Sequence, residues 1–585
     1  MAHAGVHYTV EVASLHAHLF RVTLHIAQAS AGQTVSLPVW IPGSYLVREF
    51  AKHLQHLQAK QNGKTCAITQ LDKCTWTVAC QAGELTLSYE VYALDNSVRT
   101  AWLDAARGFF NGTSLCLRVH GQEQQAHTLQ LPAVASQAAW QVATGLEPVK
   151  VNAKGFGLYR AKNYDELVDC PVEMGDFWRG EFTACGVPHQ FVVAGALPSF
   201  DKARLLADAQ KICEAEIQFW HGAQSSKTPH RRYVFMLNAV GEGYGGLEHR
   251  NSTALICGRR DLPRLGETKT SEGYTTLLGL ISHEYFHTWN VKQLRPFEMA
   301  QYDYTQENYT ELLWFFEGFT SYYDDLLLRR AGLIDDATYI KLLNKTLNQV
   351  LQTPGRQVQS VAQASFDAWV KYYRQDENTP NATVSYYTKG ALVALCMDLT
   401  LRQTGHTLDA VLRGLWHRCQ AGAMREQDLL DELQKQTGRS WHKDIKAWVH
   451  STAELPVRAL LMAQGIQVLD DEPQLAQRLG LRAVDGAGGV QIKTVLRGSA
   501  AEQAGLAAGD EWLGVEVGKA KARQQAWRLN KLDELPALLG AERQMVALVS
   551  RDKRLLRLNL RWPKNSVQWR LALPADRAAG QWPAK

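Results

Sequence analysis

Residues 275–294 read TTLLGLISHEYFHTWNVKQL and contain His283, Glu284 and His287 in an H-E-x-x-H pattern. The apolar run before the first histidine recurs at helical spacing, so the whole segment is expected to form a buried amphipathic helix. Histidines four residues apart lie on one helical face about one turn apart, the geometry that two ligands of one zinc ion need. Glu284 lies one step around the helix, where it can reach a metal-bound water without being a ligand.

A third ligand decides whether this pattern is a metal site, because H-E-x-x-H also arises by chance in long chains. A catalytic zinc takes three protein ligands and keeps one position open, whereas a structural zinc is disfavoured here by the lack of nearby cysteines. Glu317 lies within the apolar run WFFEGF (314–319), where a carboxylate is costly to bury unless it binds something. Glu317 is therefore the preferred third ligand, and Glu311, in a less apolar setting, is the alternative. The downstream carboxylates considered were Glu298, Glu307, Glu311 and Glu317.

Three changes of pattern along the chain predict a multidomain α+β protein. Residues 1–170 contain short alternating runs such as HYTVEVAS and LTLSYEVYA, separated by turn residues, which predict an antiparallel β-sandwich. Residues 171–455 mix strands with helices, and helices dominate from Thr275 onward. Residues 456–585 return to short strands and glycine turns, with one helical stretch, DELPALLG, in a segment of the right size for a small domain.

Composition excludes several classes of protein. Lysine and arginine number 63 and aspartate and glutamate 58, so the 585-residue chain carries +5, and no basic run indicates nucleic acid or an anionic membrane as a partner. The ten cysteines include no CxxC pair, which favours reduced thiols over a disulfide framework. The start of the chain lacks a signal-peptide pattern, and no run approaches roughly 18 apolar residues. A cytoplasmic location is the resulting expectation.

Further motifs carry a resemblance to a known family. They are HEYFHTWN (283–290), FEGFTSYY (316–323), GGLEHRNS (245–252), YYTKG (386–390), PGSYLVREF (42–50) and RGFFNGTS (107–114). Together they resemble the gluzincin peptidases, and the chain is most similar to the M61 family, the glycyl aminopeptidase group with a C-terminal PDZ domain. The resemblance covers nearly the whole chain. It implies a thermolysin-like mixed β and helical zinc peptidase domain over 171–455.

The resemblance also implies a role for each matched residue. His283, His287 and Glu317 would bind Zn²⁺, and Glu284 would act as general base. Glu248 of GGLEH occupies the place of the glutamate that binds the substrate's α-amino group in the G-x-M-E-N motif of related aminopeptidases. Gly245 and Gly246 would let substrate backbone approach an edge strand, and Tyr387 would stabilise the oxyanion. This chain departs from the motif at its last residue, where His249 replaces asparagine, and Leu247 replaces methionine.

Taken without the resemblance, these residues leave simpler interpretations open. The glycines around Tyr244 are equally consistent with a tight turn. Glu248, beside His249 and Arg250, could form a surface ion pair, and Tyr387 could be a core aromatic residue. From their composition alone, Arg48 and the FFNGTS loop (109–114) are candidates for the specificity pocket.

The C-terminal segment resembles a bacterial-type PDZ domain. Leu479-Gly480-Leu481 would form its carboxylate-binding loop next to Arg478, and DELPALLG would form the wall of a peptide groove. A domain whose groove is filled by its own chain is the alternative.

The function expected from all these features is zinc-dependent removal of small N-terminal residues, chiefly glycine, from peptides. The alternatives are a zinc endopeptidase and a non-catalytic PDZ-containing protein that binds peptide termini.

Overall fold

The computed structural model describes residues 5–222, 227–486, 488–518, 525–563, 568–574 and Trp582. These residues form two compact units, each with its own interior. The first unit takes in Met1–Thr310, Tyr323–Ile334 and Leu412–Leu429, and the second takes in Glu311–Tyr322, Asp335–Val411 and Leu430–Lys585. The fold is multidomain α+β, as expected, with a β-rich N-terminal part and a helical part. No helix in the described part of the chain combines the length and apolarity needed to cross a bilayer.

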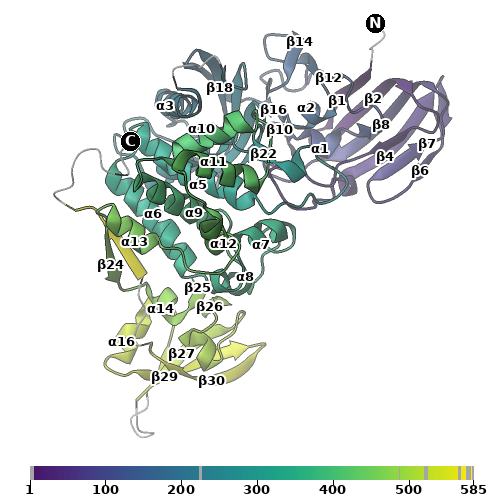
Figure 1. Cartoon of the computed structure of the whole chain (residues 1–585). Coiled ribbons are helices and arrows are strands. Elements are labelled where there is room, and N and C mark those ends of the chain that lie inside the picture. Colours follow the sequence, from purple (N-terminus) through teal and green to yellow (C-terminus); the bar gives the residue numbers. More distant parts are fainter. Residues whose placement is uncertain are drawn as a thin grey trace. The chain divides into compact units, whose positions relative to one another are not determined.

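The N-terminal part is built from an eight-stranded sheet and two four-stranded sheets. In the large sheet the central strands β1 (Val6–Ser14), β2 (Leu19–Ala29) and β8 (Gly83–Tyr92) lie side by side (Figure 1). Their inward residues are almost completely buried, since alternation along a strand sends every second side chain to the core. The large sheet continues in β4 (Leu54–Gln61), β5 (Lys64–Cys66), β12 (His127–Leu131), β14 (Glu147–Val151) and β15 (Gly157–Ala161).

The two smaller sheets pack into the same core. One contains β3 (Thr34–Ser36), β6 (Ile68–Gln70), β7 (Thr75–Val78) and β11 (Arg118–Val119), and the other β9 (Ala101–Leu103), β10 (Arg107–Phe110), β13 (Gln141–Thr144) and β16 (Val172–Gly175). The expected antiparallel pairing holds with one exception, because β1 and β12 run parallel. A connection through other strands separates them, and such a crossover permits parallel pairing.

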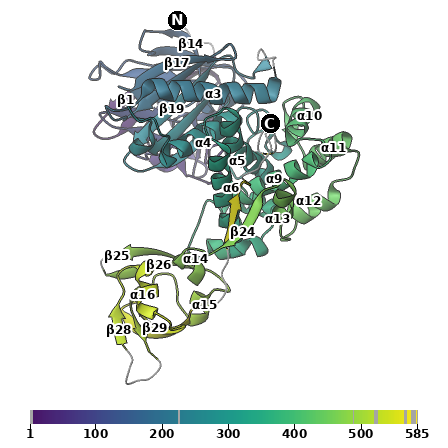
Figure 2. The ribbon, with the colours of Figure 1, turned by 90° about the vertical axis from the view of Figure 1, so that its left-hand side faces the viewer.

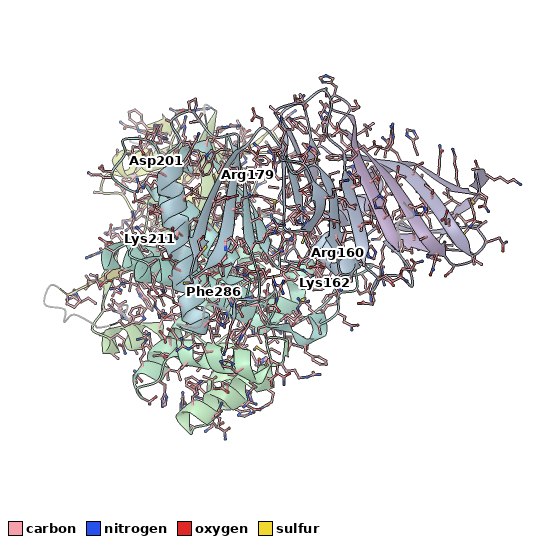
Figure 3. All side chains as sticks on the ribbon, turned by 90° about the horizontal axis from the view of Figure 1, so that it is seen from above. Arg160, Lys162, Arg179, Asp201, Lys211 and Phe286 are labelled. Carbon is pink, nitrogen blue, oxygen red and sulfur yellow. The ribbon has the colours of Figure 1, made fainter. Side chains whose placement is uncertain are left out.

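A five-stranded mixed sheet follows in the first unit. Its order is β17 (Trp178–Ala184), β18 (Val187–Ala194), β19 (Tyr233–Val240), β21 (Ser252–Gly258) and β20 (Tyr244–Glu248), so β20 forms one edge. Helix α3 (Lys202–His221) crosses this sheet (Figure 2) and packs on β17. Figure 3 shows Asp201 at the beginning of α3 and Phe286 near its other end, where the ring centroids of Phe219 and Phe286 lie 5.6 Å apart.

Helix α4 (Glu272–Phe286) carries the H-E-x-x-H pattern and packs against β20. It begins at Ser271, whose hydroxyl accepts the amide hydrogen of Tyr274 and so caps the helix. The expectation of a helix through residue 294 is wrong, because α4 ends at Phe286 and residues 288–294 form turns. The end is fixed locally: the ring of His287 bonds the carbonyl of Asn290, and Val291 adopts a φ of 145° that no α-helix contains.

In the second unit the first turns of α5 (Leu313–Arg330) cross α9 (Thr388–Arg402) at two glycines. A β-carbon placed on Gly318 would lie 2.5 Å from the α-carbon of Gly390, so the backbones touch where these residues meet. This contact brings the residues that precede Gly390, including Tyr386 and Tyr387, next to Glu317, which precedes Gly318. The unit's other described helices include α6 (Asp336–Leu351), α7 (Val361–Phe366), α8 (Thr379–Ala382), α12 (His442–Trp448) and α13 (Val457–Ala463).

The C-terminal sheet contains six strands and belongs to the second unit. The strands are β25 (Leu481–Gly486), β26 (Gly489–Val495), β27 (Glu511–Val517), β28 (Gln525–Arg528), β29 (Gln544–Arg551) and β30 (Arg554–Arg561), with β25 at one edge. It encloses its own core. A separate ribbon of β24 (Gln467–Asp471) and β31 (Gln568–Ala572) attaches the segment to α6, where the side chain of Asn348 bonds both the carbonyl and the amide of Trp569.

The helix crossing predicts a strong effect of Gly318→Ala. Because backbone atoms of α9 occupy the space, the added methyl group forces the helices apart, and overpacking of this kind costs ~1–3 kcal/mol. At ~2–4 °C per kcal/mol, we expect a measurable fall in the midpoint of thermal unfolding. Gly488→Ala, with open space around its β-carbon, is the control. An unchanged midpoint for Gly318→Ala would contradict the crossing.

Candidate active site

The two histidines of the pattern lie at the C-terminal end of α4 with their rings 4.7 Å apart and nearly perpendicular. Nδ1 of His283 donates to Oδ2 of Asp324 at 3.0 Å, and Nδ1 of His287 donates to the carbonyl oxygen of Asn290 at 2.8 Å. Each acceptor holds the ring proton on Nδ1, which leaves the lone pair on Nε2. Metal-bound histidines show the same arrangement of a ligating nitrogen and a hydrogen-bonded partner on the other ring nitrogen.

Glu317 completes a set of three possible ligands. One side-chain atom each from His283, His287 and Glu317 lie within 4.8 Å of one another, and Glu317 is only 2% exposed. Helix α5 also carries Asp324 seven residues later, and residues seven apart share a helical face. Two imidazoles and one carboxylate form the donor set of a catalytic zinc, so the residues fit the ion. The alternative ligand, Glu311, is exposed.

Glu284 lies against the edge strand β20. A β-carbon placed on Gly246 would fall 2.0 Å from Oε1 of Glu284, so no other residue fits at position 246 with the carboxylate in this place. Glu284 itself is buried. The glycine pair therefore marks close contact between the strand and this carboxylate, rather than the tight turn that the sequence alone left open.

Strand β20 presents alternate residues to its free edge. The amide of His249 donates to the carbonyl of Ser252, which makes this pair a hydrogen-bonded one. Because such pairs alternate along an antiparallel ladder, the backbone groups of Gly246 and Glu248 point away from β21, toward the open edge. The side chain of Glu248 points to the same face of the strand as a β-carbon on Gly246 would, since residues two apart lie on the same face. Glu248 and the carboxylate of Glu284 therefore lie on one face of β20.

Glu248 is buried without a matching cation in direct contact. It is 4% exposed, and its Oε1 atom has no hydrogen-bond partner among the described residues. A β-carbon on Gly43, in the PGSYLVREF loop, would lie 2.4 Å from Oε1, so this loop packs closely on the carboxylate. The surface ion pair that the sequence left open for Glu248 is not formed. Its neighbour Arg250 pairs with Asp165 and Asp169 instead.

Tyr387 lies just before α9 and close to Glu317 in the second unit. Burial, and then the charge of Glu317, raise the pKa of the Tyr387 hydroxyl well above its usual value. Tyr372 and Tyr386 stack beside it, with ring centroids 5.5 and 4.8 Å away. The crossing of α5 and α9 at Gly318 and Gly390 explains why these residues come together.

Comparison with known proteins identifies the family. Residues 7–176 match the peptidase M61 N-terminal domain, and residues 276–393 match the M61 glycyl aminopeptidase model. The structure is similar to that of an aminopeptidase N family protein from Idiomarina loihiensis, with 36% identity, a TM-score of 0.91, and coverage of 97% of this chain and 98% of that one. This chain belongs to the M61 peptidase family.

More distant structures include two of M1 zinc metallopeptidases. The protein from Deinococcus radiodurans is 14% identical with a TM-score of 0.48, covering 78% of this chain and 96% of its own. A mutant of it bound to a Tyr-Ser-Ala substrate is 14% identical with a TM-score of 0.45, covering 77% and 94%. No curated protein matched the chain.

Membership of the M61 family makes this chain an enzyme, a zinc-dependent hydrolase of the aminopeptidase class. Zn²⁺ is its cofactor, in agreement with the two imidazoles and the carboxylate described above.

This M61 protein also contains a buried charge cluster that sequence reasoning missed. Nδ1 of His249 lies 3.1 Å from Asp169, and Lys292 lies 3.1 Å from the same carboxyl group. Burial alone would raise the pKa of Asp169, but Lys292 and Arg250 outweigh it and hold that pKa well below the usual range. Burial lowers the pKa of His249. Asp169 thus fixes His249, the residue after Glu248. In the sequence, only the presence of His249 in GGLEH hinted that a buried carboxylate binds there.

The ligand set predicts different effects for two glutamates of the M61 chain. Glu317→Gln should weaken zinc binding by more than ~100-fold, because outer-shell partners alone contribute ~10–100-fold. Glu311→Gln, the exposed alternative, is the matched control and should keep full zinc content. Metal analysis after dialysis against a graded chelator measures both. If the two variants retained zinc equally, Glu317 would not be a ligand.

Proposed function

We propose that this enzyme removes small N-terminal residues, chiefly glycine, from peptides. The observation that supports the proposal most directly is the position of Glu248, buried on the same face of β20 as the carboxylate of Glu284, two residues from Gly246. A buried carboxylate without a partner on Oε1 suits the ammonium group of a peptide N-terminus. The close packing of the Gly43 loop on Glu248 leaves little room for a large first side chain, which supports the preference for glycine.

In this proposal His283, His287 and Glu317 hold Zn²⁺. When bound, the ion supplies Lewis-acid chemistry, polarising a carbonyl oxygen and lowering the pKa of water to ~7. The protein's contribution is to orient the two rings through Asp324 and the carbonyl of Asn290.

Glu284 acts as general base in the proposed reaction. Its carboxylate takes one proton from the attacking water while the new C–O bond forms at the scissile carbonyl carbon. It then passes this proton to the leaving nitrogen as the C–N bond breaks. Contact with Gly246 keeps the carboxylate beside the strand edge along which a substrate backbone would pair.

Tyr387 is the proposed donor to the developing oxyanion. Its raised pKa keeps the hydroxyl protonated at neutral pH, as a hydrogen-bond donor must be. A donor of this kind is worth ~2.7–4 kcal/mol in transition-state stabilisation.

A second proposal concerns residues 456–585, which we infer to contain a PDZ-like domain. Its support is the edge strand β25, which begins at Leu481, the last residue of Leu479-Gly480-Leu481, and is paired on one side only within the described sheet. The stretch DELPALLG folds as a short helical segment, Leu532–Glu534 followed by α16 (Leu535–Leu539), beside that sheet. An extended peptide could add to β25 by strand pairing.

Glu284→Gln tests the mechanism. The amide keeps the size of the carboxylate but cannot take a proton, so we expect kcat to fall by ~10²–10⁴-fold. Zinc content should stay complete, since Glu284 is not a ligand in this proposal. Glu272→Gln, at the exposed beginning of the same helix, is the control. A Glu284→Gln enzyme with wild-type turnover would rule out this base.

Substrate blocking tests the exopeptidase assignment. Wild-type enzyme should cleave glycyl peptides much faster than their N-acetylated forms, because acetylation removes the ammonium group that Glu248 binds. Glu248→Gln should raise KM for the unblocked peptide by about tenfold or more, the strength of a charge-assisted hydrogen bond. Equal cleavage of blocked and unblocked peptides would favour an endopeptidase, and zinc binding without any hydrolysis would favour a peptide-binding protein.

A further inference from the structure

The guanidinium group of Arg99 lies beside the proposed substrate edge. Arg99 is in the loop between β8 and β9, and its Nη2 donates to the carbonyl oxygen of Gly246 at 3.0 Å. A β-carbon on Gly245 would lie 3.7 Å from Nη1, so the group extends along the strand away from Glu248. The next residue along, Tyr244, is 63% exposed, so solvent reaches this end of β20.

Arg99 has no carboxylate partner within the described ranges of the chain. Its guanidinium donates to a neutral carbonyl, that of Gly246, and its buried Nε atom has no hydrogen-bond partner among the described residues. Taking a charged group out of water without a counter-charge is unfavourable. The same unit contains a buried guanidinium that does have its partner: Arg107 forms two 2.7 Å bonds with Glu173.

The loop that carries Arg99 is held in place by buried amides. The side chain of Asn111, in the RGFFNGTS motif, donates to the carbonyls of Val98 and Thr100, on either side of Arg99, at 2.9 and 3.1 Å. Asn238 of β19 donates to Asn96 in the same loop at 2.8 Å. Because the backbone is fixed on both sides, the guanidinium is positioned before any ligand arrives.

Arg99 and Glu248 therefore bracket Gly246 with opposite charges. Strand geometry separates the α-carbons of Gly246 and Glu248 by ~7 Å, and an extended peptide advances at the same ~3.3 Å per residue. A dipeptide or tripeptide laid along this edge would therefore extend from Glu248 past Gly246, the residue that Arg99 bonds. The carboxylate of Glu284 contacts Gly246, the same residue whose carbonyl Arg99 bonds.

We propose that Arg99 binds the C-terminal carboxylate of the substrate, which makes the enzyme selective for dipeptides and tripeptides with both ends unblocked. The inference rests on the proposed aminopeptidase function and adds the substrate length and the group that reads it. Guanidinium and carboxylate form two parallel hydrogen bonds, so Arg99 is a specificity-determining residue.

The test compares Gly-Ala and Gly-Ala-Ala with their C-terminal amides in the zinc-loaded, full-length enzyme. For at least one length, wild-type kcat/KM should favour the acid by about tenfold or more, the worth of a hydrogen bond to a charged group. Arg99→Gln keeps an amide donor near Gly246 but removes the charge, so the acid-to-amide ratio should fall to near one. Arg259→Gln is the matched control, because Arg259 also donates to a glycine carbonyl, that of Gly195.

Each outcome is decisive. If wild-type kcat/KM is about the same for the acid and the amide at both lengths, the proposal is overturned. This comparison needs no variant, so the proposal stays testable even if Arg99→Gln does not fold. An unchanged ratio in a folded Arg99→Gln also overturns it, as does an equal loss in Arg259→Gln. Binding of Gly-Ala-Ala and its amide to Glu284→Gln by calorimetry repeats the comparison without turnover. N-acetyl-Gly-Ala-Ala separates the two hypotheses: its rapid cleavage refutes the aminopeptidase proposal, whereas acid–amide indifference refutes only the role of Arg99.

Discussion

The contact between Glu284 and Gly246 is the constraint on which the rest of the site depends. It joins helix α4, which carries His283 and His287, to the edge of the five-stranded sheet, at a distance that only a glycine allows. Because the strand alternates, this one contact also fixes which residues of β20 face the helix and which backbone groups face the open edge. At Gly246 and Glu248 the side-chain position faces helix α4, and the backbone groups face the open edge of the strand. A shift of one residue in register would turn Glu248 to the other face and separate it from the base.

The histidines depend on contacts outside the motif. Asp324 and the carbonyl of Asn290 orient the rings, and the turn that supplies Asn290 exists only because α4 stops at Phe286. Helix α5 carries Asp324 and Glu317 two turns apart, so one rigid element provides both the proposed ligand Glu317 and the group that orients the ring of His283. The glycine crossing then brings the Tyr387 region next to Glu317. The end of α4 at Phe286 and the glycine crossing of α5 and α9 thus position the side chains of the candidate site.

The sequence predicted the parts of this arrangement that have a strong local pattern. H-E-x-x-H marked His283 and His287, and the aromatic surroundings of Glu317 separated it from Glu311. The sequence also indicated that helices dominate from Thr275 onward, and α5 and α9 are observed there. Strand β4 (Leu54–Gln61) was not predicted, because LQHLQAKQ is polar on both faces and lies partly exposed. The early end of α4 escaped prediction for a related reason: the bond from His287 to Asn290 competes with helix propensity and leaves no periodic trace.

Other residues could not be found from sequence because their roles depend on distant partners. Asp169 lies 80 residues before His249 and in an unremarkable segment, and nothing in that segment indicates a buried cluster. Arg99 lies 147 residues before Gly246. The RGFFNGTS loop was noticed for its composition, but its contribution is indirect, through the two carbonyls that Asn111 holds.

The first unit removes charged groups from water in two different ways. Arg107 and Glu173 are both buried and neutralise each other through two short hydrogen bonds. Arg99 and Glu248 are similar groups, yet the chain keeps them apart, with Gly246 between them. Leaving two ions partly desolvated costs stability that pairing would recover, and such a cost persists where a ligand offsets it. A short peptide with an unblocked ammonium and an unblocked carboxylate carries the two missing counter-charges. On this argument the unpaired state of Arg99 and Glu248 is part of the recognition of substrate.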